Sequence, residues 1–363
     1  MRLGEDDQSV YDISESFEFN SKNGPFGGFA DNQTYDESGP PKYEFLGAKV
    51  NSLFGVSACP ATLNSKYVNA AWAKGFDILT SKSVRSIVTP ANPFPNLLML
   101  AIDEPLKLDG EEPIVGSLTD RSQPLSVANS FGNNGPAPEV WMKDFGRVLT
   151  AQPPGKLLII SVVGTIKDGF APADYHQDFA ETAGFAVNAG AKFIELNLSC
   201  PNVASEGVVC YTPEVVLDIC KRTRAKVGNH VKILAKIGYF SSDQDYLLEH
   251  IVTDCSKFID GWTVINTLPA RIIDQAGEQA FPGKGREKAG VSGASIKWAG
   301  LEMVKKMVAL RSKYKLDYSI IGVGGILTVS DYEEYLEAGA DAAQSAAGTI
   351  WNPSLAAEIK KLK

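Results

Sequence analysis

Short apolar runs rich in β-branched residues alternate with longer amphipathic segments along most of the chain. This alternation is typical of a parallel α/β protein, in which helices connect neighbouring strands. It predicts eight strands, which we place at Ser52–Ser57, Asp77–Ser81, Leu157–Val163, Phe193–Leu198, Val231–Ile237, Gly261–Ile265, Ser319–Val323 and Ala342–Ser345.

Helices are predicted between most of these strands, for example over Pro213–Val227, Ser295–Tyr314 and Asp331–Ala338. Ser330 is expected to cap the last of these helices, and Gly339 to follow its end. Eight strands fit a closed barrel better than an open sheet. The predicted fold is therefore a (β/α)8 TIM-type barrel of the α/β class, with an N-terminal extension and a long inserted loop region.

Two segments fall outside the alternating pattern. Residues 1–45 are largely polar and are interpreted as an extension lying on the barrel, which itself spans residues 46–363. The stretch from Thr89 to Val148 is rich in Pro, Gly and Asn and is too long for a simple connection. Such excursions usually form binding loops or lids.

The composition of the 363 residues, 44% hydrophobic and 21% charged, allows a sizeable core. The net charge of −8 argues against a nucleic-acid partner and against a polybasic membrane anchor. No signal peptide is expected at the acidic amino terminus, and no apolar run is long enough to span a bilayer. The five cysteines form no C-x-x-C pair, so we expect no metal centre or disulfide framework and a cytoplasmic location.

Polar side chains directly follow several of the predicted strands. Chemistry in a barrel gathers at the carboxyl ends of its strands, so these side chains are expected to meet at one mouth. Amides can bind a cyclic amide or imide, and lysines can pair with a carboxylate or a reduced flavin. A cysteine can remove a carbon-bound proton where its surroundings lower the thiol pKa from about 8.5. The residues concerned are Lys82, Asn197, Cys200, Asn202, Lys236, Asn266 and Thr267.

Taken singly, each of these residues has a simpler interpretation. A lone cysteine is usually a small core residue, a lysine at a strand end is usually solvated, and an asparagine there usually caps a turn. Their joint occurrence after several strands favours a functional site.

Glycines after the last two strands indicate a phosphate site. Residues 320–326 run from an apolar strand into Gly322, Gly324 and Gly325, and small residues also follow Gln344. Small residues in these positions let backbone N–H groups approach a phosphate, although a tight turn also explains them. No G-x-G-x-x-G follows an early strand, so no Rossmann-type NAD site is indicated.

The segment Glu195–Val203, which reads ELNLSCPNV, closely resembles the active-site motif of the soluble, cysteine-base dihydroorotate dehydrogenases. The resemblance extends in order over about residues 46–355. It includes the segments Phe54–Ala58, Gly75–Ser83, Asn129–Gly132, Ala289–Gly293 and Gly322–Ile326.

This resemblance implies FMN across the barrel mouth and dihydroorotate as substrate, with Cys200 as the base that removes a ring proton. The FMN-binding residues would be Ser57, Ala58, Lys82, Ser83, Asn197, Lys236, Ile265, Gly293, Gly324, Gly325, Ala346 and Ala347. The substrate-binding residues would be Lys82, Asn129, Asn197, Asn202, Asn266 and Thr267. It further implies a homodimer and reoxidation of the flavin by a soluble acceptor such as fumarate.

The sequence departs from the family pattern in two places. Asn133 and Asn134 stand where Leu-Pro-Asn usually follows the Asn-Ser-Phe-Gly segment, and Ala347 replaces a hydroxyl residue in the phosphate turn. Some segments also resemble the flavin domain of dihydropyrimidine dehydrogenase, which leaves a flavoenzyme acting on dihydrouracil as an alternative. A flavin-free barrel that binds a phosphate is the third hypothesis.

Overall fold

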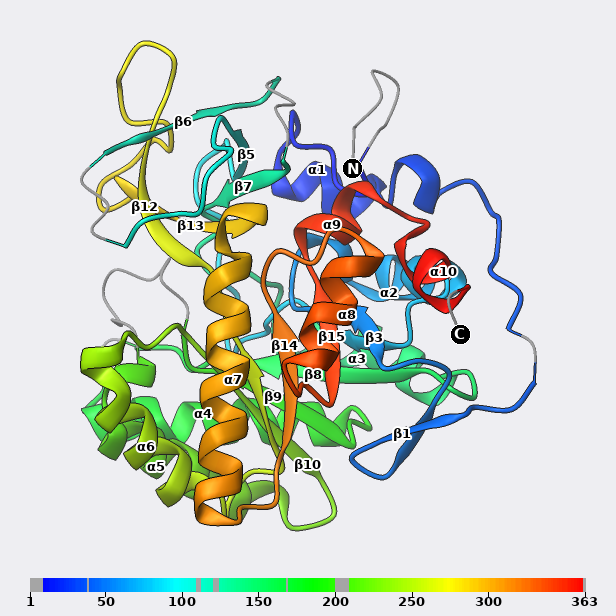
Figure 1. The fold of residues 1–363 in the computed structure, drawn as a ribbon, viewed down its shortest axis with the longest axis vertical. Helices are drawn as coiled ribbons and strands as arrows, with labels where there is room; N and C mark the ends of the chain where they lie inside the picture. Colours follow the sequence, from blue (N-terminus) through cyan, green and yellow to red (C-terminus); the bar gives the residue numbers. More distant parts are fainter. Residues whose placement is uncertain are drawn as a thin grey trace.

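The eight predicted strands form a closed barrel of parallel strands in the computed structural model (Figure 1). The structure describes residues 9–37, 39–108, 112–119, 124–167, 169–199 and 209–361. Each predicted strand agrees with an observed one to within two residues at either end, so the predicted fold class is confirmed. Around the barrel the strands are β3 (Phe54–Val56), β4 (Ile78–Thr80), β8 (Leu157–Val162), β9 (Phe193–Asn197), β10 (Lys232–Ile237), β11 (Gly261–Val264), β14 (Ser319–Val323) and β15 (Ala342–Ser345).

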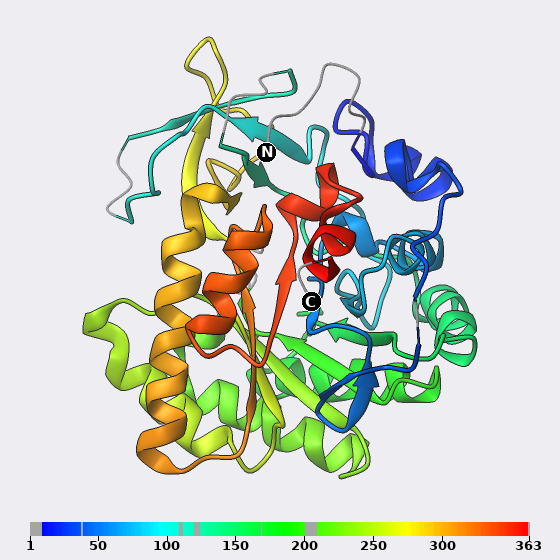
Figure 2. The same ribbon diagram turned by 45° about the vertical axis from the view of Figure 1, so that its right-hand side comes forward.

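Helices surround this barrel, as Figures 1 and 2 show from two directions. Three of them begin with a proline in the first turn, where a missing N–H costs nothing and the fixed φ suits a helix. The helices are α2 (Ser65–Ala73), α3 (Pro138–Thr150), α4 (Pro172–Asn188), α5 (Pro213–Val227), α6 (Asp245–Cys255), α7 (Lys297–Tyr314), α8 (Val329–Glu337), α9 (Ala347–Trp351) and α10 (Leu355–Lys360).

The predicted bounds of α5 are confirmed, and α7 begins after a short 3-10 turn at Ala294–Ile296. The cap predicted for α8 is wrong. Ser330 lies inside the helix, and Thr328 is the N-cap, its Oγ1 accepting from the N–H of Asp331 at 3.2 Å. The Asp331 carboxylate accepts in turn from the N–H of Thr328 at 2.9 Å. This reciprocal box satisfies two backbone donors, which a cap at Ser330 would not do. Gly339 follows the helix with φ +99°, as expected.

The inside of the barrel is apolar at one end and polar at the other. A buried cluster including Leu157, Phe193 and Leu234 occupies the end where the strands begin. The hairpin of β1 (Tyr43–Phe45) and β2 (Ala48–Val50) closes that end with Phe45 and Val50. The polar side chains are thereby left at the carboxyl ends of the strands.

The insertion after β4 is more regular than the expected loop. Its strands β5 (Leu97–Leu100), β6 (Ile114–Ser117) and β7 (Ser126–Asn129) combine with β12 (Leu268–Ile273) and β13 (Lys288–Gly293). Together these five strands form a second, small closed sheet, drawn above the barrel in Figure 1. β6 and β7 pair with β12 and β13, about 160 residues further along the chain, so distant partners order a segment whose composition indicates loops.

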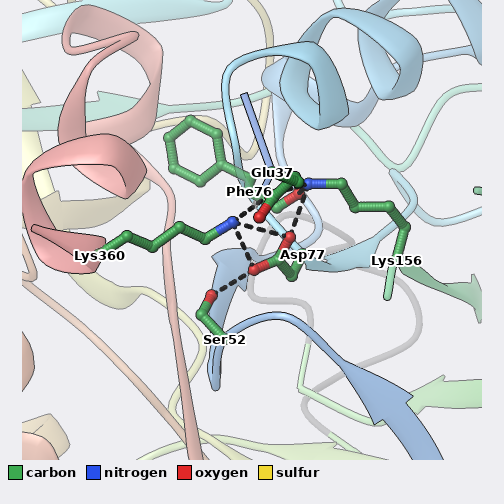
Figure 3. Close-up of polar contacts among 6 residues, drawn as sticks. All are labelled: Glu37, Ser52, Phe76, Asp77, Lys156 and Lys360. Carbon is green, nitrogen blue, oxygen red and sulfur yellow. Dashed lines mark hydrogen bonds and ion pairs between the residues drawn. The ribbon is translucent and has the colours of Figure 1, made fainter. Parts of the chain in front are cut away.

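The N-terminal arm, residues 9–37, lies against the barrel and contains the short helix α1 (Phe17–Asn23) and a 3-10 turn at Gly27–Phe29. Its far end is held by a buried cluster of charges at the closed end of the barrel (Figure 3). There Lys156 Nζ lies 2.6 Å from Asp77 and 2.8 Å from Glu37 of the arm. Lys360 of α10 contacts the same two carboxylates. The cluster therefore joins the arm and helix α10 to the residues that directly precede β4 and β8.

Candidate active site

One cavity lies at the carboxyl ends of the barrel strands, and every described residue predicted for the site lines it. Seven of the barrel strands supply one to three of them each, at or just after the carboxyl end of the strand, and Asn129 and Gly293 come from the small sheet. The residues are Ser57, Ala58, Lys82, Ser83, Asn129, Asn197, Lys236, Ile265, Asn266, Thr267, Gly293, Gly324, Gly325, Ala346 and Ala347. Cys200 and Asn202 lie outside the described residues.

One wall of the cavity, the small-residue wall, is formed by Gly293, Gly324, Gly325, Ala346 and Ala347. At two of these positions the conformation and the surrounding space allow only glycine. Gly293 has φ +105°, and a Cβ there would lie 2.4 Å from the carbonyl oxygen of Leu125. Gly325 has φ +69°, and its Cβ would lie 2.8 Å from the oxygen of Gly293. Because glycines have no side chain, the backbone of Gly293 and Gly325 can come close to a ligand in the cavity. It therefore suits a group such as a phosphate, which binds backbone N–H groups.

Two lysines bring positive charge to the opposite side. Lys236 is only 3% exposed, and its ammonium has no hydrogen-bonding partner among the described residues. Lys82 Nζ lies 4.7 Å from the centre of the Phe131 ring. A buried ammonium without a partner is costly, so this cavity is built for an electron-rich or anionic ligand.

Amides and a hydroxyl complete the polar side. Asn266 donates through Nδ2 to Asn197 Oδ1 at 3.2 Å, and Asn129 Nδ2 donates to the carbonyl of Gly290 at 3.0 Å. The hydroxyl of Thr267 is buried and has no partner among the described residues. Donors and acceptors therefore remain available for a ring that carries both kinds of group.

The inserted segment also contributes residues that the sequence did not assign. Phe131 and Asn133 line the cavity, together with Leu97 and Val127 of the small sheet. Asn133 is 7% exposed, and its Nδ2 has no partner within the described part of the chain. In the sequence, the signal that could have marked Asn133 was its departure from the family pattern.

The buried cysteines near the barrel are poor bases. Burial raises the pKa of Cys59, which lines the cavity, to about 11, and that of Cys210 to about 12. Thiols with such pKa values stay protonated at neutral pH and cannot accept a proton. Neither thiol is therefore a candidate for a base at neutral pH.

Comparison with known proteins identifies the family. A family model described as dihydroorotate dehydrogenase matches residues 118–362. The chain belongs to the dihydroorotate dehydrogenase family. Dihydroorotate dehydrogenase of Dictyostelium discoideum is 32% identical over 358 residues, covering 96% of this chain and 95% of the relative. The family is one of flavin-dependent oxidoreductases.

Two further proteins are similar over different lengths. Dihydroorotate dehydrogenase A (fumarate) of Limosilactobacillus reuteri is 32% identical over 186 residues, which is 51% of this chain and 56% of the relative. A crystal structure of the Eimeria tenella enzyme in complex with ferulenol has a TM-score of 0.66 at 17% identity. It covers 88% of this chain and 82% of that chain, and it supports the fold alone. Among the described residues of the present protein, no helix is both long and apolar enough to cross a membrane.

Proposed function

We propose that this protein oxidises dihydroorotate to orotate with FMN as its cofactor. The observation that carries the proposal is the meeting of Lys82, Asn129, Asn197, Asn266 and Thr267 in one cavity. These residues come from separate strand ends and loops, and the cavity also contains the small-residue wall. Membership of the dihydroorotate dehydrogenase family supports the same assignment.

The substrate carries a carboxylate and a cyclic imide, and the cavity offers groups for both. Lys82 would bind the carboxylate, since its ammonium faces the cavity beside Phe131. Asn129, Asn197 and Asn266 would bind the ring amides, because each asparagine supplies a donor and an acceptor. Asn202 and Thr267 would complete this set.

The residues present also fit FMN. The small-residue wall would hold the phosphate through backbone N–H groups. Ser57, Ala58 and Ile265 would border the ring, and the ammonium of Lys236 would contact it. When bound, FMN supplies the acceptor for the hydride that leaves the substrate.

Cys200 would act as the base. As a thiolate it would take a proton from one ring carbon while the neighbouring carbon gives up its hydride, which leaves a carbon–carbon double bond in orotate. The motif that contains Cys200 carries this assignment, and the raised pKa values of Cys59 and Cys210 support it.

Fumarate is the acceptor that we propose for the second half-reaction, because one relative is named for it. Following the family resemblance, we further propose a homodimer that works in the cytoplasm.

The test is the visible spectrum of the purified protein before and after dihydroorotate is added without oxygen. A flavin spectrum that bleaches promptly is expected, and Cys200→Ser should slow bleaching strongly while flavin remains bound. A flavin that bleaches with dihydrouracil but not with dihydroorotate would move the substrate to the alternative. A protein that stays colourless after FMN is added would overturn the cofactor assignment.

A further inference from the structure

A chain of hydrogen bonds leads away from the amides of the cavity. The N–H of Thr267 donates to Asn266 Oδ1 at 2.9 Å, and Asn266 Nδ2 donates to Asn197 Oδ1 at 3.2 Å. Asn197 Nδ2 then donates to Ser83 Oγ at 2.9 Å. The two amides are therefore linked to each other and to one hydroxyl.

The chain continues into the barrel and ends at a carboxylate. The hydroxyl oxygens of Ser83 and Ser161 lie 2.9 Å apart, and Ser161 donates to Glu195 Oε1 at 3.1 Å. Glu195 pairs with Ser161 across the sheet and precedes Asn197 by two residues in β9. Since side chains two apart in a strand share a face, Glu195 lies one layer below Asn197 inside the barrel.

The carboxylate gives this chain a direction. A carboxylate can only accept, so the hydrogen of Ser161 must point toward Glu195. The oxygen of Ser161 must then accept from Ser83, and the oxygen of Ser83 is left to accept from an amide nitrogen. Asn197 therefore has to present its nitrogen, and not its oxygen, to Ser83.

Solvent does not reach the inner end of this chain, although Ser83 and Asn197 line the cavity. Glu195 and Ser161 are 0% exposed, Ser83 is 6% exposed and Asn197 is 7% exposed. The second carboxylate oxygen of Glu195 has no hydrogen-bonding partner among the described residues. A buried carboxylate held by a single hydrogen bond is expensive, which argues for a role other than stabilising the barrel.

We propose that Glu195 is a positioning residue that fixes the amide orientations of Asn197 and Asn266. It thereby sets which donors and acceptors the cavity offers to a cyclic imide. This inference rests on the proposed function for its ligand class, and adds a specificity determinant that does not line the cavity. Each amide keeps one N–H and one oxygen lone pair for the ligand, at positions that a flipped amide would exchange.

The experiment uses the FMN-loaded protein and measures the Kd of orotate from its perturbation of the flavin spectrum. The variants are Glu195→Gln, Ser161→Ala and the double variant. A glutamine can donate to Ser161 and so permits the reversed chain. Each single variant is expected to weaken orotate binding by about tenfold or more, as for hydrogen bonds to charged groups. The Kd of orotate for the double variant should exceed that of the weaker-binding single variant by no more than about twofold, because both changes break the same chain.

Thr263→Val is the matched control. Thr263 is a buried barrel side chain whose hydroxyl has no partner in the described part of the chain, so removing the hydroxyl should leave the Kd unchanged. Melting temperature and flavin content are measured for all variants. If Glu195 had a purely structural role, its substitution would lower both the melting temperature and the flavin content. The effects of the two single substitutions on the Kd would then multiply in the double variant.

An unchanged orotate Kd in Glu195→Gln, or effects that multiply in the double variant, would overturn the inference. The proposed function fails in a different way, since wild-type protein would then neither bleach with dihydroorotate nor respond to orotate. That outcome would remove both proposals together. If wild-type protein bleaches with dihydroorotate and Glu195→Gln binds orotate with an unchanged Kd, only the inference about Glu195 is overturned.

Discussion

The Nζ atom of Lys156 lies 2.6 Å from a carboxylate oxygen of Asp77, whose side chain has no exposed surface. Lys360 contacts the other oxygen of the same carboxylate at 2.9 Å, so the aspartate lies between two ammonium groups (Figure 3). Burial nevertheless raises the pKa of Asp77 against the effect of both lysines. The attraction between the charges thus compensates a desolvation cost, as expected for buried ion pairs.

Replacing Asp77 by asparagine should therefore be strongly destabilising. It leaves Glu37 as the one carboxylate that contacts the two buried ammonium groups among the described residues, and breaking a buried pair in this way costs about 3–5 kcal/mol. Chemical denaturation of Asp77→Asn measures the loss. Flavin reduction in the folded fraction should be unaffected, because the cluster lies at the opposite end of the barrel from the cavity.

The exposed pair Lys49–Glu44 provides the control for Asp77→Asn. Its side chains are 67% and 56% exposed, and Lys49→Met should change stability by less than about 1 kcal/mol. Equal effects of the two substitutions would contradict the importance given to burial.

The stability of the barrel should fall in acid partly through Asp260. Burial alone would raise the pKa of Asp260, but hydrogen bonds from the Ile233 N–H, Lys232 and Arg224 outweigh it, and the pKa is lowered from 3.8. A lowered pKa in the folded state contributes stability above the ordinary value of 3.8. That contribution is lost as pH falls through the lower, folded-state pKa.

Asp260→Asn tests this linkage. At pH 7 the variant should be less stable than wild type by about 1–3 kcal/mol, the usual worth of hydrogen bonds to a charged group. The difference should shrink as pH falls below about 4, where the wild-type carboxylate also becomes protonated. Denaturation curves at several pH values measure it, and a difference that stays constant with pH would contradict the assignment.

Lys236 should matter for the flavin and not for the fold. Removing its ammonium with Lys236→Met takes away a buried charge that has no partner among the described residues, so the apoprotein should be as stable or more stable. FMN affinity and the rate of flavin reduction should both fall, the rate by about 100-fold if the ammonium stabilises developing negative charge. Fluorescence titration and stopped-flow reduction measure the two effects. Lys232→Met, on the same strand but paired with Asp260, should change stability and leave flavin reduction intact.

The barrel was predictable because most residues of its strands are apolar or small, and nearly all of them are buried. Local pattern predicted less where distant partners decide the structure. β5 consists of four apolar residues, Leu97–Leu100, in a segment rich in turn formers. It pairs with β6 and β7, and these pair in turn with the distant strands β12 and β13. The cap at Thr328 was missed because two hydroxyl residues, Thr328 and Ser330, both precede Asp331, and only the structure shows which one bonds to it.

The candidate site was predictable to a similar degree and for a similar reason. Residues at strand ends, such as Asn197 and Lys236, are placed by the barrel itself, so a correct strand prediction brings them together. Asn133 and Glu195 gave no comparable signal. Asn133 reaches the cavity through an inserted loop, and the role proposed for Glu195 depends on hydrogen bonds between strands that no sequence pattern reveals.

Asn133 is held in a conformation that favours its own residue type. Its φ of +50° is left-handed, which asparagine tolerates better than most residues, and Arg85 Nε donates to its carbonyl at 2.9 Å. Arg85 also donates to Gly164 and Thr165, so the backbone of Asn133 is fixed to a neighbouring loop. Asn133 lines the cavity, and its Nδ2 has no hydrogen-bonding partner among the described residues.

We expect Asn133 to bind an acceptor of the substrate, so that Asn133→Asp weakens dihydroorotate binding more than Asn133→Ala does. Alanine removes one hydrogen bond and should raise KM by about three- to tenfold. Aspartate adds a negative charge near the substrate carboxylate, and its repulsion should raise KM further. Steady-state kinetics with dihydroorotate measures both variants, and Asn134→Ala is the neighbouring control because Asn134 does not line this cavity. An aspartate variant with lower KM than the alanine variant would show that the side chain at 133 faces a donor of the substrate instead.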